Sequence, residues 1–105
     1  MRPFAVTFEG TASQATLTIT GEVNLTRVDD LEAVFEQACH RHPAIITVDL
    51  SAAETVDSTG LNAFARWHDV ANRTGFHVLF VQPPERVYEA LQATNLDRLL
   101  TVERR

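Results

Sequence analysis

Alternating apolar residues at the start of the chain predict two β-strands joined by a turn. Residues 4–8 place an apolar side chain at every second position, and residues 15–19 repeat this pattern with threonines in between. The intervening residues 9–14 are rich in residue types that form turns. The pattern predicts a hairpin with one covered face, whose second strand ends at Gly21.

Three later segments have the apolar spacing of amphipathic helices. The first runs over residues 28–42 and is ended by a proline. The second follows Gly60 and closes at Gly75, a residue type that commonly ends helices. The third begins near Pro84 and is followed by Asn95, which tolerates a left-handed backbone.

Two segments between these helices have the apolar character of buried strands. Residues 44–50 and 76–81 are apolar on both faces, so we expect neighbouring parallel strands covered by helices on either side. Residues 99–102 are short enough for an edge strand. The order β-β-α-β-α-β-α-β predicts a single α/β domain over residues 1–105, with a mostly parallel sheet and one antiparallel N-terminal edge strand.

Composition and charge exclude several classes of protein. The chain has 105 residues, a formal charge of −5 and no long basic run, which disfavours direct nucleic-acid binding. Its one cysteine, Cys39, excludes an intrachain disulfide and a cysteine-based zinc site, as expected in a reducing cytosol. No apolar run is long enough to insert into a membrane. We therefore expect a cytoplasmic protein that is a monomer or a weak dimer.

Residues with candidate functional side chains occur where the predicted strands end and the predicted helices begin. In open α/β sheets the functional edge lies at the carboxyl ends of the parallel strands. Residues 21–24, 53–60 and 82–84 occupy such positions. The middle stretch places Asp57, Ser58 and a threonine at the start of a helix, where their side chains can cap free backbone N–H groups.

The same stretch carries a family resemblance. Residues 48–51 (Val-Asp-Leu-Ser) and 56–61 (Val-Asp-Ser-Thr-Gly-Leu) resemble the motif of the STAS family, the sulphate transporter and anti-sigma factor antagonist domains. Residues 21–23 resemble its Gly-Glu-aliphatic turn. Residues 95–100 resemble its C-terminal Gly-Leu and paired aliphatics, so the resemblance spans essentially the whole chain.

The resemblance implies a regulatory binding module rather than an enzyme. The residue that matches the phosphorylated serine of the antagonists is Ser58, and the implied partners are an anti-sigma factor serine kinase and a phosphoserine phosphatase. The partner-binding residues implied are Asn24, Asp57, Ser58, Thr59 and Gly60. Asn24 stands where the family usually has Asp, and Asn95 stands where Gly is usual. No cofactor is expected, since no nucleotide-binding glycine pattern occurs and any ATP should belong to the partner.

Other functions are compatible with parts of the sequence. Within the family, the chain could be an accessory subunit of a phospholipid-transport ABC ATPase or a scaffold subunit of a stress-signalling assembly. Ser58 also lies on a strand-to-helix turn like a hydrolase nucleophile, but the first glycine of that motif is missing and no histidine follows the fourth or fifth predicted strand in triad order. Cys39, His40 and His42 lack a completing carboxylate, so no metal site is expected.

Overall fold

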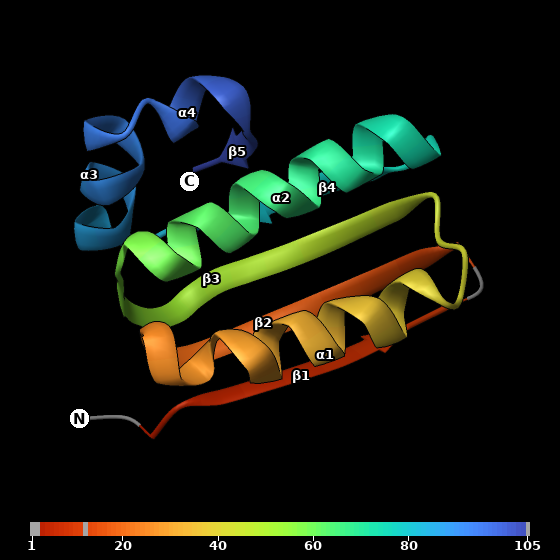
Figure 1. Cartoon of the computed structure of the whole chain (residues 1–105), viewed down its shortest axis with the longest axis horizontal. Coiled ribbons are helices and arrows are strands. Elements are labelled where there is room, and N and C mark those ends of the chain that lie inside the picture. Colours follow the sequence, from red (N-terminus) through yellow and green to blue (C-terminus); the bar gives the residue numbers. More distant parts are fainter. Residues whose placement is uncertain (1–2, 12, 105) are drawn as a thin grey trace.

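The computed structural model describes residues 3–11 and 13–104, which form one mixed sheet with helices packed against it (Figure 1). The five strands lie in the order β1-β2-β3-β4-β5. β1 pairs antiparallel with β2, and the other pairs are parallel. The elements are β1 (Ala5–Gly10), β2 (Gln14–Val23), a 3-10 helix η1 (Leu25–Arg27), α1 (Val28–Cys39), β3 (Ile45–Val56), α2 (Ser58–Thr74), β4 (His77–Val81), α3 (Glu85–Ala93), α4 (Leu96–Leu99) and β5 (Thr101–Glu103).

β3 is the central strand of the sheet. It pairs in parallel with β2 on one side and with β4 on the other, and Ile46 lies opposite both Ala15 and Val78. The predicted antiparallel edge strand is β1, whose one neighbour in the sheet is β2. The α/β class, the antiparallel hairpin and the neighbouring parallel strands are therefore confirmed.

The helices bury one face of the sheet, so the expectation of two covered faces is wrong. α1 and α2 lie in front of the sheet in Figure 1. Val48 and Phe80 point to the fully buried face, whereas their neighbours Asp49 and Leu79 stay partly exposed. On the second face, polar side chains such as Thr47 occur among apolar ones. Along β3 and β4, buried residues therefore alternate with partly exposed residues.

Several element boundaries differ from the predictions. Gly21 does not end β2, because its φ of 88° accommodates an irregularity in the pairing with β3 and the strand continues to Val23. α1 ends at Cys39, and His42 lies beyond it with a φ of 52°. Before β5 the chain forms the short helix α4, which the sequence pattern did not predict.

Two predicted helix ends are confirmed. Gly75 ends α2 with a φ of 103°, and Asn95 is left-handed with a φ of 60°.

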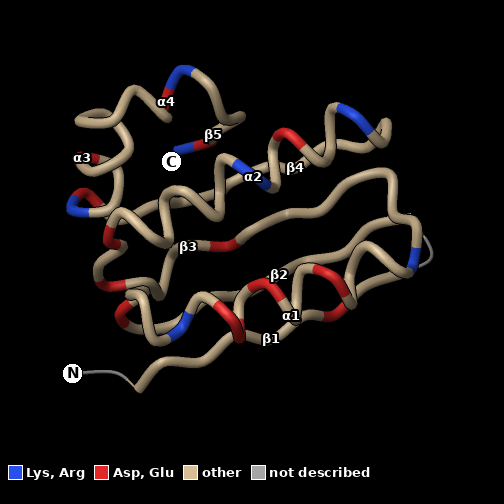
Figure 2. The backbone as a smooth tube through the Cα atoms, in the orientation of Figure 1, with Lys and Arg blue, Asp and Glu red and all other residues tan. Residues whose placement is uncertain are grey.

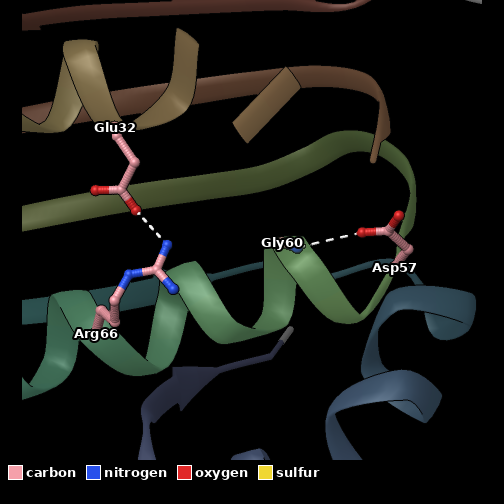
Figure 3. A network of polar contacts seen from close by, with 4 residues as sticks. All are labelled: Glu32, Asp57, Gly60 and Arg66. Atoms are coloured by element: carbon pink, nitrogen blue, oxygen red, sulfur yellow. Dashed lines mark hydrogen bonds and ion pairs between the residues drawn. The ribbon is translucent and has the colours of Figure 1, made fainter. Parts of the chain in front are cut away.

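An ion pair joins two helices: Arg66 of α2 donates to Glu32 of α1 across 2.8 Å (Figure 3). Over the described part of the chain, no helix has the length and apolar character needed to cross a membrane.

Candidate functional site

The site is built where β2 and β3 end side by side. Val23 and Val56 are the last residues of these strands and lie opposite each other in the parallel register. The backbone N–H of Asp57 donates to the carbonyl of Val23 over 3.0 Å. This bond fixes the start of α2 against the segment that leads into η1.

Asp57 is the N-cap of α2. One oxygen of its carboxylate, Oδ1, accepts hydrogen bonds from the backbone N–H groups of Thr59 (3.0 Å) and Gly60 (3.2 Å) and from the Thr59 hydroxyl (2.5 Å). Figure 3 shows the bond to Gly60. The side chain thus satisfies two N–H groups that the first helical turn leaves without intrahelical partners.

These contacts also set the charge of the cap. Partial desolvation acts to raise the pKa of Asp57, but the Thr59 hydroxyl and the backbone N–H groups of Gly60, Thr59 and Leu25 outweigh it and hold that pKa below its ordinary value. Asp57 is therefore ionised at neutral pH. Its charge lies at the positive end of the α2 dipole.

Ser58 is the first residue of α2 and is exposed. Its hydroxyl makes no hydrogen bond to any residue that the structure describes. Because Asp57 already caps the helix, the Ser58 hydroxyl is not needed for capping. The side chain is available to another molecule at a defined position beside a carboxylate.

Gly60 supports this turn from beneath. It is buried, and a Cβ atom at this position would lie 2.7 Å from a methyl carbon of Val23 and 2.7 Å from one of Val56. Real Cβ atoms essentially never come so close to other heavy atoms. The glycine therefore allows α2 to start directly against the ends of both strands.

Asn24 caps η1 on the neighbouring segment. Its Oδ1 accepts from the Thr26 backbone N–H over 3.0 Å and from the Thr26 hydroxyl over 2.6 Å, and its Nδ2 donates to Glu22 over 3.3 Å. An asparagine here does the capping work that an aspartate would do. The predicted residues Asn24, Asp57, Ser58, Thr59 and Gly60 thus lie at one edge, around the starts of η1 and α2.

One exposed residue at this edge was not predicted. Leu25 follows Asn24, and 71% of its surface is exposed. A single leucine in a short segment carries no periodic signal of burial or exposure, so the sequence pattern left it unassigned. An Asn-x-Thr stretch directly after a strand could have indicated the capped turn that holds it.

Three acidic side chains lie in the segments at the same edge. Glu22 near the end of β2, Asp57 before α2 and Glu85 at the start of α3 all belong to segments at the carboxyl ends of the parallel strands. Figure 2 shows acidic residues near the start of α2, at the end of the molecule that also holds α3. Within residues 3–11 and 13–104, no three His, Cys, Asp or Glu side chains are grouped so as to hold a metal ion.

Solved structures with the same fold include anti-sigma factor antagonists. A putative antagonist from Thermotoga maritima matches with a TM-score of 0.83 at 22% identity, over 95% of this chain and 86% of that chain. An antagonist from Mycobacterium paratuberculosis gives 0.81 at 22%, over 96% and 86%.

The Bacillus cell fate determinant SpoIIAA also matches. Its phosphorylated form gives a TM-score of 0.73 at 15% identity, over 93% of this chain and 90% of that chain. The unphosphorylated form of SpoIIAA gives 0.80 at 16%, over 93% and 87%. At these identities the likeness shows a common fold.

Sequence comparison identifies the family. Curated protein sequences gave no match. The family model described as "Mlab, STAS domain" matches residues 6–101, which is nearly the whole chain. The residues that resemble the STAS motif fall inside this range: residues 48–51 lie in the middle of β3, and residues 56–61 span the end of β3 and the start of α2. The chain therefore belongs to the STAS domain family.

Proposed function

We propose that this protein is an anti-sigma factor antagonist. In this role it binds an anti-sigma factor that is also a serine kinase, and the bound anti-sigma factor releases its sigma factor. The kinase phosphorylates Ser58, which ends the interaction, and a phosphoserine phosphatase restores it. The observation that carries the proposal is the exposed Ser58 hydroxyl, free of hydrogen bonds to the described residues and fixed at the start of α2 by the Asp57 cap.

The geometry suits a change of partner without a change of fold. A phosphoserine adds about −1.5 to −2 charges and three acceptor oxygens. Asp57 already occupies the N–H groups of Thr59 and Gly60, so the phosphate has few backbone donors left to bind within the domain. The added charge stays exposed beside a carboxylate, where it acts on whatever packs against the edge.

The energy required of such a change is modest. A complex weakens about a hundredfold for a loss of about 3 kcal/mol. Placing an unpaired charge in a desolvated interface costs at least that order. Phosphorylation of one exposed serine is therefore sufficient, and the core that holds the domain together need not move. The similarity to SpoIIAA, solved in phosphorylated and unphosphorylated forms, supports the proposal.

The test uses the serine kinase encoded nearest to this gene. The purified chain and the Ser58→Ala variant are incubated with that kinase and labelled ATP. We expect labelling of the wild type alone, because the variant lacks the acceptor oxygen. Thr59→Ala is the matched control, since the Thr59 hydroxyl is held by Asp57 and should not be the acceptor. Equal labelling of the Ser58→Ala variant would move the site elsewhere.

A second candidate function stays open, because the matching family model carries the Mlab name rather than that of an antagonist. In this alternative the chain is an accessory subunit of a phospholipid-transport ABC ATPase. Such a subunit should bind its ATPase whether or not Ser58 is phosphorylated. Equal affinities of the wild type and of the Ser58→Asp variant for an ATPase would favour this function.

A further inference from the structure

Exposed large apolar side chains are rare in this molecule. Among the described residues, only Leu25 (71% exposed) and Leu99 (50% exposed) belong to this class. Leu99 ends α4, whereas Leu25 opens η1 at the edge that holds Ser58. A single exposed leucine needs no explanation by itself. The polar contacts that hold the backbone of Leu25 in place do need an explanation.

The backbone around Leu25 is fixed by polar contacts on both sides. Asn24 caps η1 through Thr26, over 3.0 Å to its backbone N–H and 2.6 Å to its hydroxyl. The Leu25 N–H interacts with the carboxylate of Asp57 and helps to lower the pKa of that group. Asp57 in turn donates its own N–H to Val23, two residues before Leu25. The exposed side chain is therefore presented on an ordered turn, and the backbone that carries it loses little entropy on binding.

We propose that Leu25 is an apolar anchor of the partner interface, which enters an apolar pocket on the serine kinase that modifies Ser58. This inference rests on the proposed function. To transfer a phosphoryl group, the kinase must bring its active site onto the Ser58 hydroxyl, so it must also cover the surroundings of that residue. A standard interface buries about 800 Å² on each partner. Adjacent strands are only about 5 Å apart, so the segment after β2 lies inside such a footprint.

The test compares two leucine variants that each shorten an exposed side chain. Leu25→Ala should weaken binding to the kinase about tenfold, which corresponds to about 1.4 kcal/mol. Leu99→Ala should change the affinity less than twofold. Both should keep the thermal transition of the wild type within a few degrees, because neither side chain is buried. Calorimetric titration against the kinase measures the affinity, and circular dichroism measures the transition.

Steady-state phosphorylation gives an independent readout. An anchor away from the reacting atoms contributes binding energy equally before and during phosphoryl transfer. Leu25→Ala should therefore raise the KM for phosphorylation of Ser58 while kcat stays near the wild-type value. A fall in kcat with an unchanged KM would contradict the anchor role.

The outcomes separate this inference from the proposed function. If the wild type binds the kinase and is phosphorylated, and Leu25→Ala matches Leu99→Ala in affinity and KM, the anchor is wrong and the proposed function stands. If the wild type neither binds the kinase nor is phosphorylated, both fail. If Leu25→Ala instead weakens binding to an ABC ATPase, the kinase is the wrong occupant of this surface.

Discussion

Phe35 of α1 and Trp67 of α2 stack face to face, with ring centroids 4.5 Å apart and ring planes 2° from parallel. Phe64 packs against Trp67 at 5.4 Å and against Phe80 of β4 at 5.0 Å. The indole is 1% exposed, and its Nε1 makes no hydrogen bond to the described residues. These rings form a continuous contact from the helices to the sheet.

Trp67→Ala should therefore cost about 3–5 kcal/mol of unfolding free energy, in the range of large aromatic deletions from cores. Trp67→Phe should cost less, because a smaller ring still packs there and the unpaired N–H is removed. Urea unfolding followed by circular dichroism measures both. The control Arg66→Ala breaks a half-exposed ion pair and should cost about 1 kcal/mol or less. A Trp67→Ala variant as stable as this control would contradict the role of the stack.

Gly60→Ala should destabilise the fold by about 1–3 kcal/mol, because its methyl group meets the side chains of Val23 and Val56 at 2.7 Å. Unfolding in urea measures the loss. Shortening one obstructing side chain should relieve it, so Gly60→Ala should cost less in a Val23→Ala background than in the wild type.

Gly75→Ala is the matched control for this crowding. Its position has open space for a methyl group but a φ of 103°, so the substitution should cost only the strain of a left-handed backbone, about 1–2 kcal/mol. A Val23→Ala background should leave that cost unchanged. The same dependence on Val23 at both glycines would show that crowding is not the cause at Gly60.

The order of strands and helices could be predicted because periodicity is local. Alternation over residues 15–19 and the apolar run at 44–50 each reflect contacts that any sheet of this kind provides. The sequence could not predict that helices cover only one face of the sheet. Ile45 and Leu79 are apolar, yet they lie on the face that the helices leave partly exposed. The face on which the helices pack is decided by the connections between elements. The hydrophobic pattern does not encode these connections.

The candidate site also has features that the sequence predicts and features that it does not. A Ser/Asp cluster before a helix predicts a cap, and Asp57 takes that role. Sequence could not say which of Asp57, Ser58 and Thr59 would cap the helix and which would stay free, because that depends on how β3 enters the turn. Leu25 was missed because its exposure arises from the η1 turn, which has no hydrophobic period.

Asp57 should give the stability of the protein an acid-sensitive component. The folded state holds its pKa below the ordinary value, which is about 3.9 for an unfolded chain. The contribution is therefore complete above about pH 4 and is lost as the pH falls through the folded pKa. Asp57→Asn keeps a capping oxygen but has no charge to titrate. The stability gap between wild type and variant should narrow below pH 4.

Urea titrations at pH 7, 5, 4 and 3 measure this gap, with Asp57→Ala as the variant that lacks the cap. The alanine variant should lose about 1 kcal/mol at pH 7. The asparagine variant should lose less, because its amide oxygen still accepts from the helix. A gap between wild type and Asp57→Asn that stays constant from pH 7 to pH 3 would contradict a lowered pKa for Asp57.

Ser58→Asp should separate stability from binding. At the first position of α2 the new carboxylate is exposed and favoured by the helix dipole, while the charge of Asp57 opposes it, so the thermal transition should change little. In the complex the same charge is desolvated beside Asp57, and affinity for the kinase should fall. Aspartate carries about half the charge of phosphoserine, so binding should decrease in the order wild type, Ser58→Asp, phosphorylated protein. Calorimetric titration of the three forms against the kinase tests this order, and equal affinities of three folded proteins would exclude Ser58 as the regulatory site.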